Sequence, residues 1–334
     1  MGSITELHRL PSVSCADLQH QDLEIRDRAA GTFTQALRDY GACRIRDHGI
    51  PQEGIEKCFD KCRAFFERDT RMKIADAENT GPGIKGKGEV GRMASARFVP
   101  FGAEKTRGQP HLEEVLQLRD AVFNSADSDA TASMSAEARE LIDASRDLHR
   151  LCGDIHATLL ECLESSLCLV PSSLTAIHSQ ENSFFAPTYF APCSREQGQG
   201  VLRVPVHIDP TTLLFNLPDS HGGLKVADLR GISGAGKISA AEIQHTAPFI
   251  DAGCQAQDRE FTVVAGNLLR KLLGDAGIKH AVHYIERLVG SSGFHLNYWT
   301  VPDMQTRVDF GGRGEVVGEY LARVFPSTFG EGYS

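Results

Sequence analysis

Apolar and polar residues alternate between residues 201 and 209, which read V-L-R-V-P-V-H-I-D. A period of two is typical of a β-strand, in which every second side chain points to the same face. We therefore predict that His207 and Asp209 project together from one face of a strand. A second β-patterned run, H-Y-I-E-R-L-V, begins at His283.

Apolar residues recur every three or four positions in much of the first half of the chain, which predicts amphipathic helices. These predicted helices cover residues 23–40, 52–68 and 141–163, and the late segment G-E-Y-L-A-R-V-F predicts a short closing helix. Strands are predicted for C-R-I-R after Gly41, for residues 115–123, and repeatedly between residues 182 and 303. Residues 228–258, rich in Gly, Ala, Ser and Gln, interrupt these strands as an insertion.

Helices followed by short antiparallel strands predict a mainly β fold with flanking helices, whose core is a double-stranded β-helix, or jelly roll. We expect one integrated catalytic domain with three regions. A helical and mixed N-terminal region covers residues 1–180, the jelly-roll core covers residues 181–303, and a helical tail covers residues 304–334.

The 334 residues are 41% hydrophobic and 24% charged, which is ordinary for a globular chain with a sizeable core. The net charge of −9 argues against nucleic acid and anionic membranes as partners, because both are negatively charged. The nine cysteines lack C-x-x-C spacing, and no apolar run reaches transmembrane length or forms a signal core. We therefore expect a cytoplasmic protein with reduced thiols, a monomer or weak homo-oligomer that acts on a small molecule.

The H-x-D pair in the first strand suggests a metal site. One imidazole and one carboxylate supply two ligands, and His283 supplies a third. Two histidines and one carboxylate form the facial triad of non-haem Fe(II) oxygenases, which leaves other metal positions open for oxygen and substrate. An H-x-D pair alone is weak evidence, because such pairs arise by chance and most histidines are not ligands.

The surrounding sequence resembles the isopenicillin N synthase-like branch of the Fe(II)/2-oxoglutarate oxygenases. After Asp209 come the strand T-T-L-L-F-N-L and then G-G-L-K-V, as in that family. The resemblance extends, in family order, to D-Y-G-A-C-R-I-R-D-H-G-I-P, F-F-E-R-D-T-R-M-K, Y-F-A-P-C and Y-W-T-V-P-D. It implies a jelly roll that holds Fe(II) through His207, Asp209 and His283, with 2-oxoglutarate as co-substrate and O₂ as oxidant. It also suggests a tailoring enzyme of secondary metabolism, with a small molecule such as an amino acid as substrate.

Two histidines compete for the third ligand position. The family places this ligand at the end of an S-x-x-H run, and His280 stands here where the family has its serine. His283 begins the β-patterned run, and ligands of rigid sites sit on regular elements, so we choose His283.

The chain departs from the family where most members carry R-x-S to grip a carboxylate, because Gly293 and His295 stand at these two positions. A buried carboxylate needs a neutralising partner. By strand parity we assign that role to Arg287, Arg203 or His295, and we place Tyr189 of the Y-F-A-P-C block with them. Alternation also puts Asn297 and Trp299 on the inward face with His295, in the substrate pocket.

Three functions fit this pattern. The first is a 2-oxoglutarate-dependent oxygenase that oxidises an unactivated C–H bond by hydroxylation, desaturation or ring closure. The second is an Fe(II) oxidase or cyclase that needs no 2-oxoglutarate, like isopenicillin N synthase. The third is a non-catalytic binding protein on the same fold, which the intact H-x-D and His283 argue against.

A glycine-rich stretch over residues 79–91 contains G-P-G-I-K-G-K-G, which nearly matches a phosphate-binding loop. Gly88 replaces the Mg²⁺-binding Ser or Thr, and no buried strand precedes the stretch. We predict a loop at the mouth of the active site instead.

Overall fold

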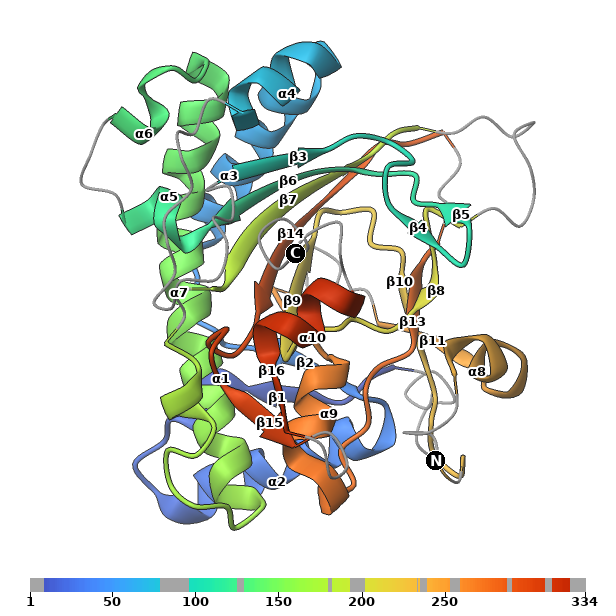
Figure 1. Ribbon diagram of the computed structural model, residues 1–334. Helices are drawn as coiled ribbons and strands as arrows, with labels where there is room; N and C mark the ends of the chain where they lie inside the picture. Colours follow the sequence, from blue (N-terminus) through green and yellow to red (C-terminus); the bar gives the residue numbers. More distant parts are fainter. Residues whose placement is uncertain are drawn as a thin grey trace.

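The computed structural model describes residues 9–78, 96–124, 129–179, 182–192, 202–232, 234, 239–252, 259–286, 290–309 and 314–324. Two β-sheets form the core of this part of the chain, with the long helix α7 (Ala136–Ser166) running along the far side of the larger sheet (Figure 1). The predicted Gly-rich loop over residues 79–91 and Arg287 lie outside the described residues.

The larger sheet has eight strands and the smaller sheet has four. In spatial order, the large sheet contains β1 (Ser12–Ser14), β2 (Ala42–Arg46), β12 (Phe261–Ala265), β9 (Leu213–Pro218), β14 (Gly293–Thr300), β7 (Phe184–Phe190), β6 (Glu114–Arg119) and β3 (Ala96–Val99). The small sheet contains β11 (Phe249–Asp251), β10 (Leu224–Ala227), β13 (His283–Ile285) and β8 (Val204–His207). Two hairpins complete the strands: β4 (Lys105–Thr106) with β5 (Gln109–Pro110), and β15 (Arg307–Asp309) with β16 (Gly314–Val316).

The helices lie mainly before the small sheet in sequence. They are α1 (Cys15–Leu18), α2 (Leu23–Asp39), α3 (Gln52–Phe66), α4 (Thr70–Glu78), α5 (Asp120–Asn124), α6 (Asp129–Ala132), α7, α8 (Ala240–Thr246), α9 (Asn267–Leu273) and α10 (Val317–Val324), with 3₁₀ turns at Thr175–Ile177 and Gly274–Ala276. The predicted helices over residues 23–40, 52–68 and 141–163 and the closing helix are confirmed as α2, α3, α7 and α10.

Apolar side chains fill two layers, one on each face of the large sheet. The outer layer packs the sheet against α2, α3 and α7 through residues such as Phe33, Phe65 and Leu159. The inner layer joins the two sheets, with Leu214 and Val264 from the large sheet against Leu224 and Val226 from the small one. Two sheets that are antiparallel apart from the β1–β2 pair pack face to face with helices outside, which is the architecture that the sequence pattern predicted.

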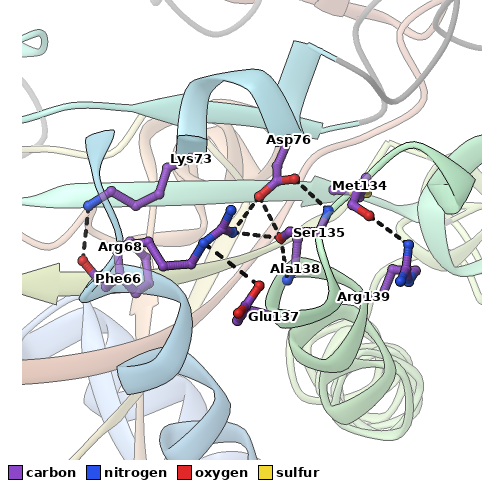
Figure 2. A network of polar contacts seen from close by, with 9 residues as sticks. All are labelled: Phe66, Arg68, Lys73, Asp76, Met134, Ser135, Glu137, Ala138 and Arg139. Carbon is purple, nitrogen blue, oxygen red and sulfur yellow. Dashed lines mark hydrogen bonds and ion pairs between the residues drawn. The ribbon is translucent and has the colours of Figure 1, made fainter. Parts of the chain in front are cut away.

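A polar network ties α4 to α7 and to the large sheet (Figure 2). Arg68, just after α3, donates to Asp76 Oδ2 at 2.5 Å and to Ser135 Oγ at 2.6 Å. Asp76 Oδ1 accepts from the backbone N–H of Ser135, the N-cap residue of α7, at 2.7 Å. Lys73 donates to the Phe66 carbonyl at 3.0 Å. Lys73 also reaches Glu114 on β6 at 2.6 Å. Since Asp76, Lys73 and Glu114 are buried, these bonds fix the register of α4.

Two local predictions were wrong. The strand predicted over residues 115–123 ends at Arg119, because its partner there, Phe184, is the first residue of β7, and α5 follows. The strand expected to carry Asp209 ends at His207, because its partner there, His283, is the first residue of β13. The predicted insertion over residues 228–258 contains α8 and β11, the edge strand of the small sheet.

Candidate metal centre and cavity

A cavity of about 670 Å³ lies between the two sheets. Both sheets line it, together with the β4–β5 hairpin and residues of α8, α9 and α10. His207, Asp209 and His283 are part of its wall, so a molecule in the cavity can touch the predicted metal ligands.

Neighbouring strands of the small sheet bring the three predicted ligands together. His207 on β8 pairs directly with His283 on β13, and their rings lie 4.2 Å apart. Asp209 follows β8 and places Oδ1 at 3.4 Å from His207 Nε2 and Oδ2 at 3.7 Å from His283 Nε2. These separations exceed ordinary hydrogen-bond lengths and suit donor atoms that share one ion.

Each histidine directs its Nε2 atom toward Asp209. The Nδ1 atom of His207 lies 2.8 Å from the Pro205 carbonyl oxygen, and that of His283 lies 3.4 Å from the Ala281 carbonyl oxygen. A carbonyl oxygen only accepts, so the proton resides on Nδ1 and the lone pair on Nε2. A second hydrogen bond of this kind orients most metal-binding histidines in proteins.

The charges of the site also favour a cation. Burial disfavours the charged imidazole of His207, but contact with the Asp209 carboxylate raises its pKa nonetheless. Burial together with the nearby His207 lowers the pKa of His283 to about 4. Burial works to raise the pKa of Asp209, yet the two histidines lower it, so Asp209 is ionised.

A divalent metal fits these residues. Asp209 Oδ2 is buried and accepts no hydrogen bond from the part of the chain that the structure describes. Leaving a carboxylate oxygen buried without a partner is costly, and a metal ion at the three converging donor atoms would remove that cost.

His280 lies outside this group. It lines the same cavity but is not among the three residues whose donor atoms converge. It is 4% exposed, and neither ring nitrogen has a hydrogen-bond partner among the described residues. Burial, with a smaller effect of Arg270, lowers its pKa to about 4, so it is neutral at pH 7.

The face of β14 that was predicted to point inward does so. Phe294, Leu296 and Tyr298 belong to the core under the helices, whereas His295, Asn297 and Trp299 line the cavity. Both ring nitrogens of His295 form hydrogen bonds there.

Asn216 Nδ2 lies 3.0 Å from His295 Nδ1, and His295 Nε2 lies 3.1 Å from the Gly222 carbonyl oxygen. The amide group donates to Nδ1, and Nε2–H donates to the carbonyl. Burial lowers the pKa of His295, which agrees with a neutral ring. The one N–H of a neutral His295 is therefore already used by the Gly222 carbonyl.

Neither Arg203 nor Tyr189 lines the cavity. Arg203 is 2% exposed, its guanidinium lies over the Phe190 ring at 5.1 Å, and Nη2 donates to the Ser291 carbonyl at 2.7 Å. Tyr189 stacks on Phe66 at 5.8 Å under the helices, on the face of β7 opposite Phe190. Its assignment to the co-substrate is wrong, because the Y-F-A-P-C block begins on the outward phase of the strand.

The sequence analysis missed a second group of polar side chains in the cavity wall. Glu104, His111 and Glu113 flank the β4–β5 hairpin, and donor atoms of all three lie within 4.8 Å of one another. One signal was available: H-L-E over residues 111–113 has the same histidine-to-carboxylate spacing as H-I-D.

Comparison with known proteins agrees with this arrangement. A family model described as "non-haem dioxygenase in morphine synthesis N-terminal" matches residues 10–141. The 2-oxoglutarate-dependent dioxygenase frbA of Dothideomycetidae sp. is 22% identical over 228 residues, which cover 66% of each protein. The 2-oxoglutarate-dependent dioxygenase htyE of Aspergillus rugulosus is 24% identical over 201 residues, 59% of this chain and 60% of that protein. The chain thus spans just under two-thirds of these relatives' lengths.

Solved structures share the fold. The dioxygenase for auxin oxidation from rice superimposes with a TM-score of 0.69 at 16% identity, covering 96% of this chain and 95% of that one. A Neurospora crassa protein in complex with alpha-KG and thymine gives a TM-score of 0.72 at 14% identity, covering 96% and 97%. A putative 2OG-Fe(II) oxygenase family protein from Caulobacter crescentus gives 0.69 at 17%, covering 95% and 99%. The predicted jelly-roll fold is confirmed.

Among the described residues, no helix is both long enough and apolar enough to cross a membrane. The cysteines at positions 15, 43, 58, 62, 152, 162 and 168 are free thiols, and all but Cys168 are buried.

Proposed function

We propose that this chain, which resembles the non-haem Fe(II)/2-oxoglutarate-dependent oxygenases in sequence and fold, oxidises an unactivated C–H bond of a small molecule, by hydroxylation, desaturation or ring closure. The observation that carries the proposal is the convergence of His207 Nε2, Asp209 and His283 Nε2 in the wall of a cavity between the two sheets. Its fungal relatives bear names that fit secondary metabolism, and an amino acid is one substrate of suitable size.

In this proposal His207, Asp209 and His283 hold Fe(II). The bound iron, with 2-oxoglutarate and O₂, supplies the oxidising power, and 2-oxoglutarate leaves as succinate and CO₂. The protein contributes a mostly apolar cavity, which limits water around the reacting carbon. Backbone carbonyl groups hold both imidazoles in the metal-binding orientation before any metal arrives.

Arg203 is our candidate for the cation that neutralises the distal carboxylate of 2-oxoglutarate. Its Nη1 lies 3.1 Å from the point where a Cβ on Gly293 would stand, and Gly293 is the position of the family's arginine. The Phe190 ring lies between the Arg203 guanidinium and the cavity. The attraction between Arg203 and a carboxylate in the cavity would therefore act across that ring. Arg287 is a second candidate from the sequence, and His295 can assist only if it is protonated or exchanges Gly222 for the ligand.

The decisive experiment measures succinate. Protein loaded anaerobically with Fe(II) is exposed to O₂ with and without 2-oxoglutarate, and succinate is followed by mass spectrometry. We expect slow succinate formation even without the true substrate, and none from the His207→Ala or Asp209→Ala variants, whose melting temperatures without metal should match that of the metal-free wild type. The absence of succinate, with consumption of O₂ and a substrate in 2-oxoglutarate-free protein, would favour an oxidase like isopenicillin N synthase.

That oxidase remains the second candidate because of one observation. Among the described residues that line the cavity, no buried arginine or lysine is present, and the family's arginine is Gly293. Fe(II) binding without O₂ consumption under any of these conditions would leave only the third candidate, a binding protein.

We further propose that the protein works in the cytoplasm as one integrated domain, with a small molecule as its partner and no stable association with nucleic acid or membranes. The free thiols and the net charge of −9 support this proposal. Size-exclusion chromatography with light scattering tests the expected monomer or weak homo-oligomer.

A further inference from the structure

Glu104, His111 and Glu113 form what we call the acidic wall of the cavity. Glu104 and His111 are each 8% exposed, and Glu113 is half-buried. The ring of His111 lies 6.0 Å from that of His207, so the acidic wall adjoins the proposed metal ligands.

The acidic wall is rigidly attached to the strand that carries His207. Arg107 and Gly108 have φ values of 51° and 79°, which make the tight hairpin turn between β4 and β5. The backbone N–H of His111 donates to the Glu104 carbonyl at 2.9 Å, which closes the hairpin. Leu112 N–H donates to the Arg203 carbonyl at 2.7 Å, and Arg107 donates to the Val206 carbonyl at 3.1 Å. These two bonds hold the hairpin against β8.

Within the acidic wall, one carboxylate oxygen lacks a donor. His111 Nδ1 lies 3.0 Å from Glu113 Oε1, and His111 Nε2 lies 2.8 Å from Thr106 Oγ1, so both its nitrogens are engaged. Glu104 Oε1 is buried and accepts no hydrogen bond from the described residues, and Arg97 Nη1 stands 4.0 Å from it. Burial and the nearby charge of Glu113 raise the pKa of Glu104. A buried acceptor of this kind calls for a charged donor.

We propose that the acidic wall binds the ammonium group of an amine substrate; this rests on the proposed function, whose substrate class it names. An ammonium group has three N–H donors and no acceptor, which suits a wall that offers carboxylate oxygens. A second transition-metal ion held partly by His111 suits it less, because both ring nitrogens of His111 are already engaged and neither offers a free lone pair.

The other residues that line the cavity indicate that the rest of the amine molecule is apolar. Val206, Leu224 and Ile285 of the small sheet line it, and Phe190 and Leu214 line it from the large sheet. The substrate is therefore an apolar molecule with a basic nitrogen at one end. Since the acidic wall adjoins His207, the carbons next to the nitrogen lie nearest the metal site.

The test compares benzylamine with benzyl alcohol, a neutral probe of the same shape. Dissociation constants are measured by ligand-observed NMR on the full chain. The protein is loaded with Zn(II) in place of iron, or with Mn(II) where paramagnetic relaxation still leaves the ligand signals measurable. We expect benzylamine to bind at least about tenfold more tightly than benzyl alcohol, the size of one charge-assisted hydrogen bond. Glu104→Gln should weaken benzylamine about tenfold to a hundredfold and leave benzyl alcohol unchanged.

Glu113→Gln provides a second variant should Glu104→Gln fail to fold, and Glu140→Gln on the exposed side of α7 is the matched control that should change neither affinity. Equal binding of the two probes, or benzylamine binding that neither cavity variant weakens, would overturn the inference. So would two tightly bound Mn(II) ions per chain that fall to one in Glu104→Gln. Succinate release from 2-oxoglutarate tests the proposed function separately, since it needs no amine.

Discussion

The guanidinium group of Arg203 lies against the backbone of Gly293, so that a Cβ at residue 293 would stand 3.1 Å from Arg203 Nη1. Arg203 directly precedes β8 of the small sheet, and Gly293 begins β14 of the large sheet. The sequence resemblance places the carboxylate-binding arginine of the family at the position of Gly293. This chain thus brings a buried guanidinium to the same region from another strand, and glycine leaves the room for it.

Gly293→Arg should therefore destabilise the protein while Arg203 is present. The new side chain would meet an existing guanidinium of like charge, and overpacking of this kind costs roughly 1–3 kcal/mol. The double variant Gly293→Arg/Arg203→Ala should recover much of that loss, because one guanidinium then occupies the space. Urea unfolding of the three proteins measures both effects. Equal stability of Gly293→Arg with and without Arg203 would show that the two side chains do not compete.

Removal of His283 and of His280 should have different consequences for metal binding. We expect His283→Ala to lose bound Fe(II) and His280→Ala to retain it, because only His283 converges with His207 and Asp209. A metal at about 100 times its dissociation constant stabilises a fold by roughly 2.7 kcal/mol. Added Mn(II) should thus raise the melting temperature of the wild type and of His280→Ala but not of His283→Ala. The opposite pattern would make His280 the third ligand.

The buried ion pair between Lys73 and Glu114 should be costly to break from one side. Both side chains are 3% exposed, and their charged atoms lie 2.6 Å apart. Lys73→Met leaves the Glu114 carboxylate buried without its cation, at a cost of about 3–5 kcal/mol, whereas Lys73→Met/Glu114→Leu should recover most of it. Lys61→Met is the control, since its pair with Glu140 is exposed and should contribute less than about 1 kcal/mol. Chemical denaturation provides these values.

Stability should fall as the pH drops from 7 to 5. Burial lowers the pKa values of His149 and His178 to about 4 in the folded state, and both residues are 5% exposed. In the unfolded chain these histidines titrate near pH 6.5. Between about pH 4 and pH 6.5 the unfolded chain therefore binds more protons than the folded chain. Each residue should account for about 2 kcal/mol of the loss between pH 7 and pH 5.

This effect can be measured by urea unfolding of metal-free protein at several pH values, so that the proposed ligands do not contribute through metal release. His149→Phe should reduce the slope, because phenylalanine keeps the stacking on Phe123, whose ring lies 4.4 Å from that of His149, and cannot titrate. An unchanged slope in this variant would mean that His149 is solvated or charged in the folded protein.

Local sequence was sufficient for whatever depends on periodicity. Apolar spacing was enough to predict the helices α2, α3 and α7 and the inward face of β14. An element that buries one face needs apolar residues at its own period, wherever it lies in the fold. The H-x-D pair and the resemblance around it identified the metal ligand candidates, since chemistry of that kind needs few residue types at short spacing.

What depends on contact between distant segments was decided by the tertiary structure. Tyr189 was assigned to the cavity because it belongs to the Y-F-A-P-C block, without regard to which face of the strand it occupies. In the fold it packs under α3, away from the cavity. Parity also left Arg203 free to point inward, whereas Phe190 of another sheet covers it. Glu104 and Glu113 join the cavity only because the β4–β5 hairpin bonds to β8, far along the chain. Periodicity states which way a side chain faces relative to its own strand, but only packing determines what stands opposite it.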